Sequence, residues 1–227
     1  MIKLKITWKY CLAFYCVIML HVSLHELVHH FVAAIICGEF GYKSFNSFDA
    51  ACDGEPKAFI ATYAGPLYTF LMMYLGMFWL KASNSNFKKH LGFATIFAQL
   101  PAQRLMGPPM TMNDEMYATG QLWGYSAINI IIVSVILLFI CLPPLIKAYK
   151  SIENSRKVWW FLFYFLLFPY ILFGPFFGLF EYLMLQRGVL DQTIIGIGLL
   201  FIINEVVTIL LYWTTKKFID PEHSSNS

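Results

Sequence analysis

Long apolar runs separated by short polar segments dominate the chain. The hydrocarbon core of a bilayer is about 30 Å thick, so a helix that crosses it needs about 20 mostly apolar residues. Runs that meet or approach this length predict six transmembrane helices, at about 10–37, 58–80, 91–107, 122–146, 158–184 and 190–214. We therefore expect an all-α, polytopic membrane protein whose helices are joined by short loops.

The third of these runs is the least regular. Gln99, Pro101, Gln103 and Arg104 interrupt its second half. Non-helical backbone at membrane depth is tolerated only where it is buried in protein or lines a cavity. We therefore expect this segment to lie among other helices or beside a polar cavity.

Composition supports the membrane assignment. Of the 227 residues, 59% are hydrophobic and only 13% are charged, whereas a soluble domain carries about 25% charged residues. No room is left for a soluble domain, so we predict one membrane-embedded domain at 1–219 and a polar, disordered tail at 220–227. The net charge of +3 is small and divided among short loops, which argues against nucleic-acid binding.

Lys and Arg in the loops predict the orientation, because they are enriched on the cytoplasmic side. Twelve of the 16 basic residues fall on the side that holds both chain ends. We therefore expect cytoplasmic N and C termini and an outward-facing loop at 38–56. Cys37 and Cys52 lie at the ends of this loop. Outside the cytosol they would be able to form a disulfide, although two unrelated thiols fit the sequence equally well.

The first apolar run contains the pattern H-E-x-x-H at His25-Glu26-Leu27-Val28-His29. Residues four apart on a helix project from one face, so both imidazoles can bind one metal ion, with Glu26 beside a metal-bound water. A metalloprotease would use this Glu as its general base. A charge at the centre of a membrane helix costs roughly 2.5–3.5 kcal/mol on insertion scales, so such a cluster should face a metal, a cavity or a partner. A packed His/Glu cluster without a metal is the plainer alternative.

Two further stretches are expected at the same membrane face as the histidines. The histidines lie late in an outward-going helix, and Ala64-Gly65-Pro66-Leu67 lies early in the following inward-going helix. Asp114 follows the next outward-going helix, after Gly107 and two prolines. The up-and-down order of the helices therefore brings all three together, whichever way the protein is inserted.

These three stretches together resemble the site-2 protease family of intramembrane zinc metalloproteases. In that family an early H-E-x-x-H is followed by a Gly-Pro stretch, and an Asp far downstream completes the zinc site. The 85-residue separation between His29 and Asp114 is similar. The resemblance covers roughly residues 10 to 120. It implies that His25, His29 and Asp114 bind Zn²⁺ and that Glu26 is the general base.

The chain departs from the family pattern in two places. Thr69 stands where the family often has Asn, three residues after the Gly-Pro pair. Glu115 follows Asp114 where the family usually has Gly, so Glu115 is an alternative third ligand. The family's catalytic centre commonly opens toward the cytosol, whereas the loop charges here predict an outward-facing site.

The sequence therefore predicts an intramembrane zinc endopeptidase that cleaves a transmembrane protein or peptide. The alternative is a non-catalytic metal-binding membrane protein or a metal transporter, neither of which would need Glu26. Di-iron membrane oxidases use more histidines than the six found here. The prenyl-protein-processing type of membrane protease takes a Glu as its third ligand, and Glu181 would be the candidate. The sequence does not specify the substrate or the oligomeric state.

Overall fold

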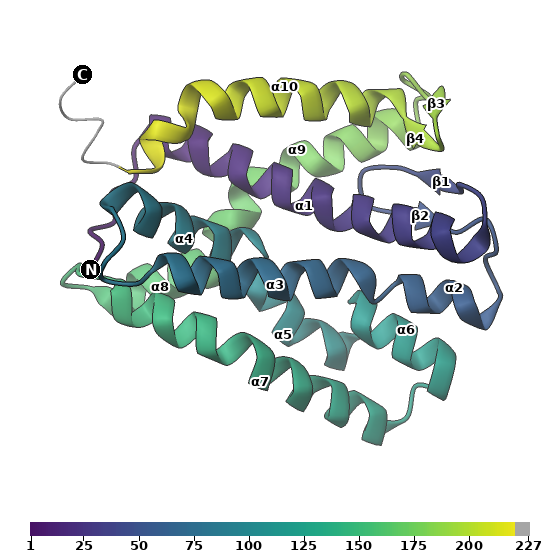
Figure 1. The fold of residues 1–227 in the computed structure, drawn as a ribbon, viewed down its shortest axis with the longest axis horizontal. Coiled ribbons are helices and arrows are strands. Elements are labelled where there is room, and N and C mark those ends of the chain that lie inside the picture. The colour runs from purple at the N-terminus through teal and green to yellow at the C-terminus, as the bar shows by residue number, and fades with distance from the viewer. Residues whose placement is uncertain (221–227) are drawn as a thin grey trace.

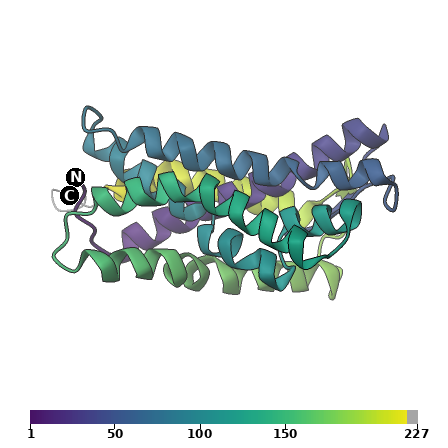
Figure 2. The same cartoon turned by 90° about the horizontal axis from the view of Figure 1, so that it is seen from below.

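The computed structural model describes residues 1–220, and it is predominantly helical (Figure 1). Within these residues, five helical segments are long and apolar enough to cross a membrane: Trp8–Cys37, Pro56–Trp79, Ala127–Ser151, Lys157–Leu185 and Leu199–Ile219. They run roughly along the long axis of the molecule, and the N-terminus lies at the same end as the close of the last helix (Figures 1 and 2). This confirms the expected all-α, multi-pass architecture.

The helices form in the following order. Their bounds are α1 Trp8–Cys37, α2 Pro56–Ala61, α3 Ala64–Trp79, α4 Asn86–Ala98, α5 Pro101–Met110, α6 Asp114–Trp123, α7 Ala127–Ser151, α8 Lys157–Leu166, α9 Phe168–Leu185, α10 Leu199–Thr215 and the 3-10 helix η1 Lys216–Ile219.

Helix α1 runs through the middle of the molecule and packs against α2, α3, α4, α9 and α10 (Figure 1). It begins where the Thr7 side chain accepts a hydrogen bond from the Tyr10 amide, and it ends at Gly38, which adopts a left-handed conformation. Its buried face is aromatic near the N-terminus, where Phe14 stacks on Phe168 with ring centroids 5.2 Å apart. A central helix of this kind holds its polar residues inside the protein and away from lipid.

The third predicted span consists of two shorter helices, α4 and α5, neither of which is long enough alone to cross a membrane. Leu100 between them has a φ of 51° and is left-handed. Pro101 disfavours the right-handed α conformation in the residue before it, so α4 does not continue through Leu100. The last predicted span also begins later than expected, at Leu199, because the preceding residues form a β-hairpin.

A small four-stranded sheet lies beside α1, and it was not predicted. Its strand order is β2-β1-β4-β3, with β2 Phe48–Asp49, β1 Tyr42–Lys43, β4 Ile197–Gly198 and β3 Thr193–Ile194. The two halves join through the parallel pair β1–β4, where the Lys43 amide donates to the Gly196 carbonyl at 2.8 Å. A side chain at Gly196 would collide with the Gly41 carbonyl, so the close approach of these strands requires glycine.

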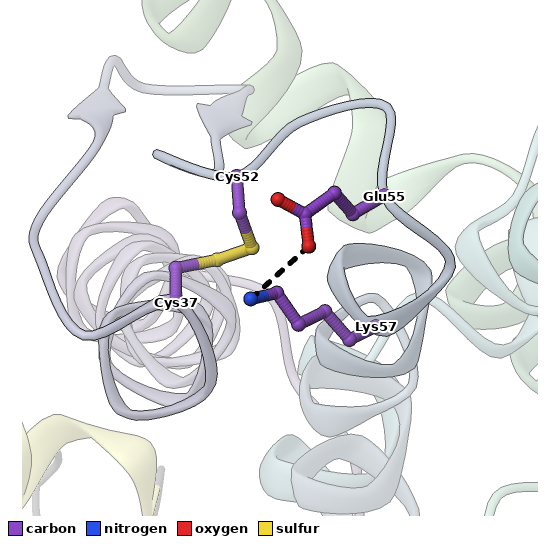
Figure 3. Close-up of a disulfide and its surroundings, with 4 residues drawn as sticks. All are labelled: Cys37, Cys52, Glu55 and Lys57. Atoms are coloured by element: carbon purple, nitrogen blue, oxygen red, sulfur yellow. Dashed lines mark ion pairs between the residues drawn. A yellow bond between two sulfur atoms is a disulfide. The ribbon is translucent and has the colours of Figure 1, made fainter.

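The loop between α1 and α2 is closed by a disulfide between Cys37 and Cys52 (Figure 3). This bond decides between the two alternatives that the sequence left open. Glu55 and Lys57 form an ion pair of 3.1 Å beside it (Figure 3). At the other end of the molecule, Asp220 is buried with its carboxyl 3.9 Å from His90 Nε2. The remainder of the predicted tail, 221–227, lies outside the described residues.

Candidate metal centre

Three side chains bring one ligand atom each to a common point. His25 Nε2 lies 3.1 Å from His29 Nε2 and 3.1 Å from Asp114 Oδ2, and His29 Nε2 lies 3.7 Å from the same oxygen. Tetrahedral zinc with bonds of 2.0–2.2 Å requires ligand atoms about 3.3 Å apart. The three residues could therefore hold a metal ion with little rearrangement.

Two helices position the three possible ligands. The two histidines are one turn apart on α1, and Asp114 opens α6, where the Asn113 side chain caps the helix by accepting from the Met116 amide at 3.2 Å. Gly65 on α3 lies against both imidazoles. A Cβ built on Gly65 would lie 2.7 Å from His25 Nε2 and closer still to His29 Nε2. The backbone of α3 therefore forms one wall of the centre, and only glycine leaves room for it.

The Nδ1 atom of each imidazole contacts a partner outside the ligand group, so that Nε2 is the nitrogen that could bind a metal. His25 Nδ1 lies 2.9 Å from Thr69 Oγ1, and His29 Nδ1 lies 3.0 Å from the Ala61 carbonyl oxygen. A carbonyl only accepts, so the proton of His29 resides on Nδ1, although the Gly65 amide also lies 3.3 Å from that atom. Outer partners of this kind orient metal-binding histidines. Thr69 and Ala61 were not assigned this role from the sequence.

Arg104 is a further member of the centre that sequence reasoning did not assign to it. Its Nη1 donates to Asp114 Oδ2 at 2.8 Å and to Glu115 Oε2 at 3.3 Å, and its Nη2 lies 3.1 Å from His25 Nε2. Burial alone would raise the pKa of Asp114. The contacts with the two imidazoles and the charge of Arg104 outweigh burial and hold this pKa well below its usual range. Asp114 is therefore ionised, the form in which a carboxylate could bind a metal.

Glu115 lines a different cavity from Glu26 and Asp114. One of its carboxylate oxygens accepts from Arg104, and the other has no hydrogen-bond partner among the described residues. Burial raises the pKa of Glu115. The group of possible metal ligands found within residues 1–220 contains Asp114 and not Glu115, so the geometry favours Asp114 as the third ligand.

Glu26 borders two cavities that meet at the centre. One has a volume of about 350 Å³ and extends toward α4, α5 and α9; the other is about 370 Å³ and extends toward β2, α2 and α6. Both are lined by Glu26, Asn46 and Asp114. Glu26 therefore lies where a molecule entering either cavity would reach the ligand triangle.

Lys43 is a buried cation that the sequence analysis placed in an exposed loop. Its Nζ donates to the Ser44 carbonyl and lies 4.3 Å from the centre of the Phe201 ring. Burial lowers the pKa of Lys43 to about 8, although the carboxylates of Glu26, Glu181 and Glu205 counteract part of this effect. Lys43 therefore compensates the negative charge that several acidic side chains bring into the interior.

Glu181 and Glu205, the acidic residues of the last two predicted spans, have hydrogen-bond partners away from the metal centre. Glu181 accepts from Ser44 Oγ at 2.8 Å and from the Phe45 amide at 2.9 Å, so it anchors the turn after β1. Glu205 accepts from Ser23 Oγ at 2.6 Å. These hydrogen bonds give both acids a structural role, and Glu181 does not belong to the ligand group that the described residues form.

Comparison with known proteins adds no relative. No family model, curated protein or solved structure matches the chain. The argument about function therefore depends on the site itself.

Proposed function

We propose that the protein is an intramembrane zinc-dependent endopeptidase that cleaves a transmembrane protein or peptide. The supporting observation is that His25 Nε2, His29 Nε2 and Asp114 Oδ2 converge from α1 and α6 beside the Glu of an H-E-x-x-H motif. Two neutral nitrogens and one carboxylate suit zinc and leave a fourth position open, as catalytic zinc sites do.

Three groups of residues would each have one role in hydrolysis: the metal ligands, Glu26 and Arg104. Zinc held by the three ligands supplies Lewis acidity and lowers the pKa of water. Glu26 lines the meeting point of both cavities, so its carboxylate takes a proton from the attacking water and returns it to the leaving amine. Arg104 keeps Asp114 ionised and oriented through the 2.8 Å hydrogen bond.

The two cavities support an extended substrate. Amides within a helix are hydrogen-bonded and shielded, so a membrane-spanning substrate must unwind locally before its peptide bond is attacked. Cavities that extend from Glu26 in two directions would receive the unwound segment on both sides of the scissile bond. Their polar lining would also admit the water that hydrolysis consumes.

The disulfide supports an outward-facing site. Cys37 and Cys52 close the loop that carries β2, and Phe48 of β2 stacks on His29 with ring centroids 4.8 Å apart. Disulfides persist in oxidising compartments and are rare in the cytosol. Together with the loop charges, this favours cytoplasmic termini and a metal centre near the opposite membrane face.

Metal transport is the less well supported alternative. Neither a transporter nor a non-catalytic binding protein would need Glu26, which lines both cavities at the centre.

The proposal is tested by metal analysis and by cleavage of a reporter with a single transmembrane segment, both on protein purified in detergent. We expect one zinc per chain in the wild type and in Glu26→Gln, and loss of zinc in His25→Ala. Cleavage should be lost in both variants. Glu153→Gln, which removes an exposed carboxylate at a distance from the centre, should behave as wild type. Cleavage by Glu26→Gln at the wild-type rate would reject the mechanism.

A further inference from the structure

The break between α4 and α5 brings Gln99 to the wall of the cavity beside the metal centre. Gln99 is the C-cap residue directly after α4, and the left-handed Leu100 follows it. A left-handed conformation is rare for a branched residue, and such strain tends to occur at ligand-binding sites, where the surrounding structure maintains it. Gln99 lines the same cavity as His25, Glu26 and Asp114.

Two buried hydrogen-bond donors in this wall have no acceptor. Gln99 is 4% exposed, and its Nε2 has no hydrogen-bond partner among residues 1–220. The Nε of Arg104 is likewise buried and without an acceptor, although both Nη atoms of this residue are engaged. Buried donors are nearly always paired in folded proteins, so each exception needs an explanation.

The rest of the cavity indicates what would pair with them. The lining also includes Phe173 and Phe177 of α9, whose side chains offer no conventional acceptor. The acidic side chains of the lining form no hydrogen bond with either of the two donors. An unwound peptide segment exposes main-chain carbonyl oxygens that have lost their helical partners, and these require donors inside the membrane. The cavity volume of about 350 Å³ is large enough for a short peptide segment.

We propose that Gln99 and Arg104 form a carbonyl-binding subsite next to the metal centre. In this subsite Gln99 Nε2 and Arg104 Nε donate hydrogen bonds to main-chain carbonyl oxygens of an unwound substrate beside the scissile bond. The inference rests on the proposed peptidase function and adds how the substrate is held. It assigns recognition of the backbone, and not of particular side chains, to this cavity.

The test measures the binding affinity of hydroxamates, which chelate zinc, so it does not depend on catalytic turnover. The probes are acetohydroxamic acid and two dileucyl hydroxamates that carry the dipeptide on opposite sides of the chelating group. Binding is measured by calorimetry on zinc-loaded protein. The variants are Gln99→Leu, Gln99→Met as a second apolar side chain of similar length, and Gln121→Leu, which makes the same change at an exposed site on α6.

We expect Gln99→Leu and Gln99→Met to weaken one of the two dileucyl probes about tenfold, the effect of losing one buried hydrogen bond. Acetohydroxamic acid should bind all variants equally, and Gln121→Leu should change nothing. Wild-type affinity for both dileucyl probes in the Gln99 variants would overturn the subsite. An equal loss for acetohydroxamic acid would also overturn it, because Gln99 would then act through the metal centre. If acetohydroxamic acid does not bind the wild type, the metal centre itself fails and the subsite fails with it.

Discussion

The closest packing at the metal centre is that of Gly65 against the two imidazoles, and it gives the sharpest prediction. In Gly65→Ala the new methyl group would lie 2.7 Å from His25 Nε2, whereas ordinary contacts begin at 3.4 Å. Either the imidazole or α3 must therefore move by about 0.7 Å, and the contact with His29 is tighter still. Zinc–ligand distances tolerate only about 0.2 Å of deviation.

We expect this substitution to weaken zinc binding by at least about 100-fold, at the upper end of what changes around metal ligands cost. Affinity is measured by competition with a calibrated chelator. Gly174→Ala is the matched control, because a Cβ at Gly174 meets nothing within 4 Å. It also replaces glycine by alanine inside a helix, where helix propensity favours alanine by about 1 kcal/mol. The control therefore includes the effect of this propensity without the collision. Zinc affinity in Gly65→Ala within threefold of the control would refute the reasoning.

Three further predictions concern the surroundings of the centre. Thr69→Val removes the oxygen 2.9 Å from His25 Nδ1, so chelator competition should show about tenfold weaker zinc binding. Thr69→Ser, which keeps the hydroxyl group, should bind zinc as the wild type does. The pKa of Lys43 is lowered from an ordinary 10.5 to about 8 in the folded protein. Between these two pH values the unfolded chain binds more protons than the folded chain. The free energy of unfolding should therefore rise with pH across this window, by about 3 kcal/mol at most. Lys43→Met should abolish this rise in unfolding experiments in mild detergent, and an unchanged pH profile would exclude Lys43 as its source. Cys52→Ser removes the disulfide that closes a loop whose ends are 15 residues apart, and it should lower the free energy of unfolding by about 3 kcal/mol. Dithiothreitol should destabilise the wild type and leave this variant unchanged. If it destabilises both equally, the loss of stability does not come from the disulfide.

Helix periodicity accounts for the part of the centre that was predicted. The four-residue spacing of His25 and His29 places both imidazoles on one face of any helix. The alternation of outward-going and inward-going spans then brings Gly65 and Asp114 to the same membrane face. These inferences need only the apolar runs and the regular geometry of helices, and the distances among the three ligand atoms agree with them.

The features that were missed depend on contacts between distant residues. Strands β1 and β4 are two residues long and are separated by about 150 residues of chain, so neither has a periodicity that a sequence reveals. Arg104 was predicted only as one of the residues that interrupt the third span, because its approach to Asp114 depends on the break at Leu100 and on the turn before α6. The disulfide was left open because the distance between its cysteines depends on how the loop folds.

The most direct test of the account is X-ray absorption at the zinc edge, together with metal analysis, on the wild type and on Asp114→Ala. The account predicts one zinc per wild-type chain with only nitrogen and oxygen ligands at about 2.0–2.2 Å. It also predicts at least one fewer protein ligand, or loss of the metal, in the variant. Sulfur ligation near 2.3 Å, or an identical spectrum and zinc content in Asp114→Ala, would contradict the proposal that these three side chains bind the ion.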